Sequence, residues 1–245
     1  MDELFKNYIF DLYGTLIDIR TDEEKIELWE KMAIFYGYRK ANYSAFELRQ
    51  TYHAMCDALK LETQKKHPDY QKVDFDLTRV FRKLYEAKGV TVSDELASMT
   101  ANVFRCYSTD FIKLYDGVED LLKTLKSKGK HIYLLSNAQH DFTLPEIDML
   151  GLREYFDDIL ISSDFECSKP DTHYFEILFE RNSLKKEDSI MIGNDCVSDI
   201  KSAHNFGIKS LYIHQEISPP ITVKLESSWN VMDGSVKKIK KMIVR

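Results

Sequence analysis

The sequence predicts an α/β fold, a Rossmann-like doubly wound parallel sheet with an inserted all-α cap domain. Short apolar segments alternate with helical patterns in the C-terminal half of the 245-residue chain, which is typical of a parallel sheet. Near the N-terminus a further apolar segment, Tyr8-Ile9-Phe10, precedes residues 18–111, whose apolar positions recur at helical spacing. The N-terminal strand therefore belongs to the sheet, and the helical block interrupts the sheet domain.

The expected strands are short and apolar, and helical patterns follow them. The strands cover residues 8–10, 132–135, 158–161, 190–192 and 210–213, and helices among them cover 118–129, 171–181 and 199–206. A closing helix at residues 236–243 has one apolar face, and its lysines read as a solvated face rather than a membrane or nucleic-acid patch.

Residues 18–111 contain four amphipathic patterns that predict four helices. Ser44, with Glu47 three residues later, has the form of a capping box and marks the start of the second helix. His67-Pro68-Asp69 separates the two helical pairs, and Ser93 is the expected cap of the fourth helix. We therefore assign residues 1–17 and 112–245 to the core and residues 18–111 to the cap.

Composition restricts the class of function. A formal net charge of -6 argues against nucleic acid as a partner. No run of about 20 apolar residues predicts a membrane span, and the N-terminus lacks the basic start and apolar stretch of a signal peptide. The four cysteines lack metal-site spacing and are too few for a disulfide scaffold. We expect a cytoplasmic protein, monomer or homodimer, that acts on a small molecule.

Polar residues follow the apolar strands at four places. Asp11 ends the first strand at a sharp turn, Ser136 ends the second, and Lys169 follows the third. Asp195 and Asp199 follow the fourth. Because ligands bind outside the carboxyl ends of the strands in an open parallel sheet, we expect these side chains to converge.

The chemistry of these residue types suits a substrate that carries a phosphoryl group. A carboxylate attacks phosphorus and forms an aspartyl-phosphate. A serine hydroxyl and neighbouring amides hold phosphoryl oxygens, and a lysine neutralises the charge that develops in the transition state. Acidic residues bind Mg²⁺, which prefers oxygen ligands and bridges protein to phosphate.

Four motifs in order resemble those of a known superfamily. They are Asp11-Leu12-Tyr13-Gly14-Thr15, Ser136-Asn137, Lys169-Pro170-Asp171 and Gly193-Asn194-Asp195-Cys196-Val197-Ser198-Asp199. Their order and spacing are similar to those of the haloacid dehalogenase (HAD) superfamily over essentially the whole chain. The helical insert resembles that superfamily's α-helical cap of the first type.

The resemblance implies a role for each motif residue. Asp11 is the implied nucleophile, and Lys169 orients both the nucleophile and the transferring group. Ser136 binds that group, while Thr15 supports the turn and lines the substrate site with Asn137. The implied Mg²⁺ ligands are Asp11, the backbone carbonyl of Tyr13 and Asp195, with Asp199 and Asn194 as further candidates.

Tyr13 departs from the pattern of the superfamily's phosphatases, where a second aspartate protonates the leaving oxygen and then activates water. A phenol has a pKa of about 10, so it is a poor general base at neutral pH. The same tyrosine is typical of the superfamily's 2-haloacid dehalogenases. Those enzymes attack carbon without a metal, and their departing halide needs no proton.

The fourth motif favours a phosphatase instead. Dehalogenases resemble Ser-Ser-Asn-x-x-Asp there, and alignment on Asp199 puts Cys196 in the place of the asparagine. Dehalogenases also have a tyrosine six residues after the lysine, where this chain has Phe175. Arg49 on a cap helix resembles the arginine that binds the substrate carboxylate, but its offset from Asp11 is several residues longer. Arg49 is therefore a candidate substrate-binding residue.

These observations predict a Mg²⁺-dependent hydrolase, a phosphatase of a small phosphorylated metabolite that works through an aspartyl-phosphate. Tyr13 predicts slow turnover, or a preference for substrates whose leaving group needs little proton help. The alternative is a metal-free 2-haloacid dehalogenase that uses Asp11 against carbon. A further alternative is a catalytically weak protein that binds a phosphorylated ligand.

Overall fold

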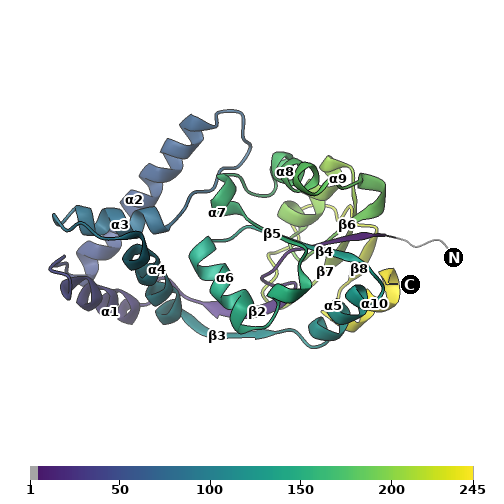
Figure 1. The fold of residues 1–245 in the computed structure, drawn as a ribbon, viewed down its shortest axis with the longest axis horizontal. Helices are drawn as coiled ribbons and strands as arrows, with labels where there is room; N and C mark the ends of the chain where they lie inside the picture. Colours follow the sequence, from purple (N-terminus) through teal and green to yellow (C-terminus); the bar gives the residue numbers. More distant parts are fainter. Residues whose placement is uncertain (1–4, 245) are drawn as a thin grey trace.

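The computed structural model describes residues 5–244, which form a core and a cap (Figure 1). In the view of Figure 1 the helical cap lies on the left, and the sheet with its covering helices lies on the right. Within the described residues, no helix combines the length and apolar character that a bilayer crossing requires.

The core is a parallel sheet of six strands within residues 5–244, and this confirms the predicted fold class. β1 (Asn7–Phe10) lies between β4 (His131–Ser136) and β6 (Ser189–Gly193). The chain continues from β4 to one edge of the sheet and then returns to the other side of β1, so the carboxyl ends of these three strands form a topological switch point. The remaining strands are β5 (Asp158–Ile161) beside β4, then β7 (Lys209–Ile213) and β8 (Trp229–Val231) beyond β6.

Helices cover both faces of the sheet because alternate residues of each strand point to opposite sides. In β1, Phe10 packs in one hydrophobic cluster with α5 and α10, whereas Ile9 packs in another with α8 and α9. Both side chains are fully buried, as expected for a strand covered on two faces. The covering helices are α5 (Val118–Ser127), α8 (Thr172–Asn182), α9 (Ser202–Phe206) and α10 (Val236–Ile243).

The cap has its own hydrophobic cluster, in which Trp29, Tyr52 and Phe104 pack ring against ring. Ser44 and Ser93 cap the second and fourth helices through their side chains, as the sequence predicts. The cap helices are α1 (Ile26–Gly37), α2 (Ala45–Lys66), α3 (Thr78–Glu86) and α4 (Asp94–Ser108).

A two-stranded antiparallel ribbon joins the cap to the core. β2 (Ile17–Thr21) pairs with β3 (Thr109–Leu114), and Figure 1 shows the ribbon along the lower side of the view between the cap and the sheet. No pattern in the sequence predicts this ribbon, and the expected domain boundaries at residues 17/18 and 111/112 fall inside it.

Two helices at the carboxyl edge of the sheet face the cap. They are α6 (His140–Met149), which follows β4, and α7 (Ser162–Phe165), which follows β5. Phe142 of α6 belongs to the cap's hydrophobic cluster, so core and cap share packing at this helix. Short turns complete the core as the 3-10 helices η1 (Arg153–Tyr155) and η2 (Lys186–Asp188) and the π-helix η3 (Cys196–Lys201).

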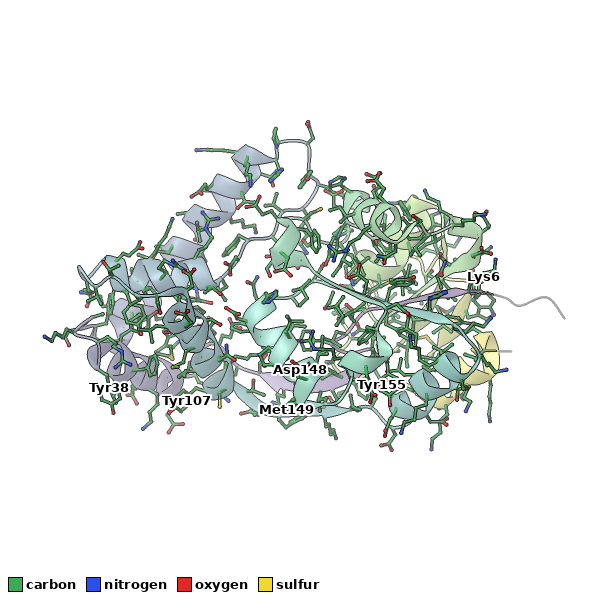
Figure 2. The ribbon with its side chains drawn as sticks, in the orientation of Figure 1. Lys6, Tyr38, Tyr107, Asp148, Met149 and Tyr155 are labelled. Carbon is green, nitrogen blue, oxygen red and sulfur yellow. The ribbon has the colours of Figure 1, made fainter. Side chains whose placement is uncertain are left out.

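Some large apolar side chains remain exposed. Tyr38 and Tyr107 on the cap and Met149 on α6 lie along the lower side of the view in Figure 2. The described chain is a single copy, so the expectation of a monomer or homodimer stays a prediction.

Candidate active site

Four of the expected site residues meet at the carboxyl edge of the sheet. Asp11 directly follows β1, and Lys169 comes from the loop before α8. The Lys169 ammonium Nζ lies 2.9 Å from Asp11 Oδ1 and 2.7 Å from Asp199 Oδ1. Ser136 ends β4, the strand that pairs with β1. Residues separated by up to 188 positions are therefore neighbours, as the strand order requires.

The Lys169 side chain is only 1% exposed and lies between two carboxylates. Burial alone lowers the pKa of Lys169, but the charges of Asp11 and Asp199 outweigh burial and raise it. Burial raises the pKa of Asp199, and the ammonium of Lys169 opposes that rise. Lys169 is therefore a protonated, desolvated cation directed at the Asp11 carboxylate.

The turn after β1 brings Thr15 back to Asp11. Thr15 Oγ1 lies 3.3 Å from Asp11 Oδ2 and 3.4 Å from Asn194 Oδ1. Gly14 makes this turn with a φ of 80°, and a Cβ there would lie 2.0 Å from the side-chain Nδ2 of Asn194. A similar restriction applies at Gly193, where a Cβ would lie 2.3 Å from Asp199 Oδ2. Two motif glycines thus leave room for two polar side chains of the site.

The fourth motif divides its polar side chains between the site and the backbone. Asn194 is buried, its Nδ2 donates to Ser218 Oγ at 3.3 Å, and its Oδ1 faces Thr15. Asp195 is half-buried, and its Oδ1 accepts the amides of Val197 and Ser198 at 2.7 and 3.1 Å. The Asp195 carboxylate therefore caps η3, and Asn194 is the residue that contacts Thr15, whose hydroxyl also contacts Asp11.

Ser136 and Asn137 have different surroundings. Ser136 Oγ is buried and has no hydrogen-bond partner within residues 5–244. An unpaired buried hydroxyl is unfavourable, so this oxygen is suited to contact a ligand. The Asn137 side chain instead holds the Lys169 backbone, because Oδ1 accepts from Lys169 N and Nδ2 donates to Lys169 O, each at 2.8 Å.

The Tyr13 hydroxyl points to helix α6. It donates to Glu146 Oε2 at 2.5 Å and lies 3.1 Å from Thr143 Oγ1. Arg105 of cap helix α4 pairs with the same carboxylate, Nε to Oε1, at 2.6 Å. Burial, and then the charge of Glu146, raise the pKa of Tyr13 well above its usual range. The phenol therefore stays neutral, which supports the expectation that it is a poor base.

Glu146 and Arg105 did not emerge from sequence reasoning. Arg105 lies in α4 and Glu146 in α6, and no motif marks either position. Only the fold brings α4 and α6 together at Tyr13.

Arg49 has a partner within the cap. Its guanidinium contacts Glu24, and within the described residues no hydrogen bond or ion pair joins it to Asp11, Ser136 or Lys169. Its role in substrate binding therefore stays a prediction. Phe175 is fully buried in the core, where it packs against Phe206.

The oxygen atoms around Asp11 fit a hard cation with few protein ligands. Asp11 Oδ2 and Asn194 Oδ1 both approach the Thr15 hydroxyl. No group of three or more His, Cys, Asp or Glu side chains within residues 5–244 is arranged to hold a metal by itself. Mg²⁺ is commonly bound through one or two carboxylates, waters and substrate phosphates. The oxygen atoms of Asp11 and Asn194 agree with that type of coordination.

A family model described as a haloacid dehalogenase-like hydrolase matches residues 5–207. The chain belongs to the haloacid dehalogenase-like hydrolase family. It is therefore a HAD hydrolase, and its relatives include both phosphatases and dehalogenases.

Three relatives illustrate this range. Pyrimidine 5'-nucleotidase PynA of Streptococcus pneumoniae is 23% identical over 85% of this chain and 83% of its own length. An (S)-2-haloacid dehalogenase of Pseudomonas fluorescens is 20% identical over 85% of this chain and 84% of its own. The magnesium-bound HAD hydrolase YfnB of Bacillus subtilis has the same fold, with a TM-score of 0.57, 17% identity and coverage of 98% and 99% of the two chains. The chain spans about half the length of some other curated phosphatases that it matches.

Proposed function

We propose that this HAD hydrolase is a Mg²⁺-dependent phosphatase of a small phosphorylated metabolite and acts in the cytoplasm. The observation that carries the proposal is the buried cluster at the switch point. There Lys169 contacts one oxygen of Asp11 and the Thr15 hydroxyl contacts the other, while Asn194 Oδ1 lies on the same hydroxyl. The Ser136 hydroxyl, which has no hydrogen-bond partner among the described residues, ends the neighbouring strand. This combination of nucleophile, cation, oxygen donors and free hydroxyl suits a phosphoryl group.

The proposed reaction has two steps. Asp11 attacks phosphorus in line, so a carboxylate oxygen–phosphorus bond forms as the bond to the leaving oxygen breaks. Water then hydrolyses the aspartyl-phosphate and regenerates the carboxylate. Lys169 neutralises charge on the transferring group, and Ser136 donates to one of its oxygens.

The proposed Mg²⁺ ligands are Asp11, the Tyr13 backbone carbonyl and Asn194. When bound, the ion would neutralise negative charge shared between the carboxylate and the phosphoryl oxygens. Asn194 takes the place that sequence reasoning favoured for Asp195, because the Asp195 carboxylate is engaged by two backbone amides. Asp199 is held by Lys169 and by the Asp195 amide. We therefore assign Asp199 to positioning the lysine.

The leaving group receives little proton help in this proposal. The Tyr13 hydroxyl donates to Glu146, and burial keeps it protonated, so it does not act as a base at neutral pH. We infer a preference for substrates with a stable leaving group, such as acyl or aryl phosphates, over simple alkyl phosphates.

The test is a phosphatase assay over a panel of phosphorylated metabolites, with and without Mg²⁺. We expect phosphate release that needs Mg²⁺ and that Asp11→Asn lowers by several orders of magnitude, since the nucleophile is lost. Asp69→Ala, which changes an exposed carboxylate between α2 and α3, is the matched control and keeps full activity. Mg²⁺-independent turnover, or activity that survives Asp11→Asn, contradicts the proposal.

Tyr13 supports a second candidate, a 2-haloacid dehalogenase. In that reaction Asp11 attacks carbon, and the halide leaves without a proton. Halide release from 2-chloropropionate that persists in EDTA would select this candidate. Binding of a phosphate analogue without any turnover would instead indicate a catalytically weak phospho-ligand-binding protein.

A further inference from the structure

The segment between cap helices α2 and α3, residues 67–77, leaves the cap and lies on the core. We call it the connector, and Figure 1 shows it descending from the end of α2 beside α7 before it returns to α3. Val73 forms an antiparallel bridge with Cys167. Asp74 N donates to Glu166 O at 3.2 Å, and Ser168 N donates to Lys72 O at 3.1 Å. The connector therefore pairs with the chain immediately before Lys169.

Contacts on both sides of Lys169 extend this pairing. Asp171 Oδ2 accepts the connector amide of Gln71 at 2.6 Å, while its Oδ1 caps α8 through the His173 amide at 2.9 Å. On the core side, the Asn137 side chain holds the Lys169 backbone through two hydrogen bonds. The loop that supplies the buried cation is thus held between the core and the connector.

The Asp74 side chain reaches the second loop of the site. Its Oδ2 accepts from Ser162 Oγ at 2.5 Å, and Ser162 Oγ in turn accepts the Ala138 amide at 2.8 Å. Gln139 Nε2 donates to Asp74 Oδ1 at 3.3 Å, and Gln139 Oε1 accepts the connector amide of Leu77 at 2.8 Å. Residues 138 and 139 directly follow Ser136 and Asn137 in the chain.

The Asp74 contacts are largely shielded from water. Burial raises the pKa of Asp74, and the hydrogen bond from Ser162 opposes the rise. Burying a carboxylate is unfavourable unless its hydrogen bonds are made, so the loss of one of these partners is costly for Asp74.

We propose that Asp74 is a positioning residue through which the docked cap orders the two catalytic loops, residues 136–139 and 166–171. The active site is complete only while the connector lies on the core. The catalytic part of this inference rests on the proposed function, whereas the coupling between connector and loops does not.

The kinetic test compares Asp74→Ala, Asp74→Asn and the control Asp69→Ala. Misplacement of Lys169 and Ser136 in Asp74→Ala is expected to lower kcat by roughly 10- to 100-fold with little change in KM. Asp74→Asn is expected to recover most of the rate. Its amide donates to Ser162 Oγ, whose own hydrogen then turns to Ala138 O, already 3.2 Å away. Asp69→Ala behaves as the unmodified protein.

A second test measures amide hydrogen exchange by mass spectrometry and needs no turnover. We expect Asp74→Ala to speed exchange in both 136–139 and 166–171, and Asp74→Asn and Asp69→Ala to leave it unchanged. Ser162→Ala removes the Ser162–Asp74 hydrogen bond from the core side, and we expect it to speed exchange in the same two loops. This second variant keeps the test possible if the Asp74→Ala protein fails to fold. Unchanged exchange in either loop overturns the proposal, and so does a kcat loss that Asp74→Asn fails to recover.

The two tests separate the two hypotheses. Faster exchange in a protein without phosphatase activity keeps the coupling and rejects the proposed function. Full phosphatase activity with no effect of Asp74→Ala on exchange or kcat keeps the proposed function and rejects the coupling.

Discussion

At the scale of single residues, the fourth motif shows that two adjacent side chains can contact entirely different neighbours. β6 ends at Gly193, and Asn194 then points to Thr15, while Asp195 turns to the first amides of η3. Residue types at strand ends predicted from the sequence that Asp11, Lys169 and Asp199 would lie together, as they do. The direction of each side chain depends on where the strand ends and the helix begins, and a one-residue shift in that boundary is not visible in the pattern.

Three substitutions at two neighbouring positions test which residue binds Mg²⁺. Asn194→Ala is expected to weaken Mg²⁺ binding by about tenfold or more, as loss of support around a metal typically does, and Asn194→Asp to tighten it through the added charge. Asp195→Ala is expected to cost about 1 kcal/mol of stability as a lost helix cap, with little change in Mg²⁺ affinity. Calorimetric titration with Mg²⁺ measures the affinities. The opposite ranking would return the ligand role to Asp195.

Tyr13→Phe tests the neutral role of the phenol. We expect the free energy of unfolding to fall by about 1–3 kcal/mol, because the buried Glu146 carboxylate loses a hydrogen-bond donor. Because the folded-state pKa of Tyr13 is raised, its contribution to stability is present below the ordinary pKa and is lost only as pH rises beyond it. The pH profile of kcat/KM between about pH 6 and about pH 9 should therefore keep its shape in Tyr13→Phe. Loss of one limb of the profile would show that the phenol transfers a proton.

At the scale of elements, the periodic cap helices and the continuously apolar core strands were predictable, and the strands without either signal were not. The cap helices and the central strands have clear apolar periodicity, and the structure confirms them. β8 has only three residues, too few for a pattern to stand out. β2 is as long as the predicted core strands, but its sequence Ile-Asp-Ile-Arg-Thr lacks their continuous apolar run. β3 follows α4 without any intervening residue, so its sequence reads as a continuation of the helix. The ribbon exists because β2 and β3 pair, which no local signal reveals.

The ion pair between Arg105 and Glu146 joins α4 to α6, and we predict its contribution to the free energy of unfolding. Arg105 and Glu146 are 14% and 10% exposed, so removing one partner leaves a largely buried charge. Arg105→Met is expected to lower the free energy of unfolding by about 3–5 kcal/mol. Arg105→Met with Glu146→Leu is expected to recover much of that loss, because no lone charge remains. Urea denaturation measures both.

The control for this prediction is Lys123→Met on α5. Lys123 pairs with Glu119 on an exposed helix face, so its loss should change stability little. A similar loss in Lys123→Met and Arg105→Met would show that burial of the α4–α6 pair is unimportant.

At the scale of the whole molecule, the cap and the core are joined at several separate places. The ribbon, Phe142 in the cap cluster, the Arg105–Glu146 pair and the connector all cross between them. The sequence predicted that an insert exists and that it is helical. It could not predict these crossings, since each pairs residues from distant segments whose partners depend on the relative placement of the two parts.

The two tryptophans report on the two parts separately, because Trp29 lies in the cap cluster and Trp229 in β8 packs on Phe5. We expect the single-tryptophan variants Trp229→Phe and Trp29→Phe each to show fluorescence and circular dichroism transitions that coincide within about 2 °C. The reason is that the crossings make cap and core unfold together. A cap tryptophan signal that melts well before the circular dichroism signal would show two independent units.

The enclosure of Lys169 has a practical consequence for following the enzyme in solution. An amine sealed from water is equally sealed from acylating reagents, whereas surface lysines react at once. The rate at which Lys169 is labelled, measured by peptide mass spectrometry, would therefore report how often the enzyme opens and exposes this side chain.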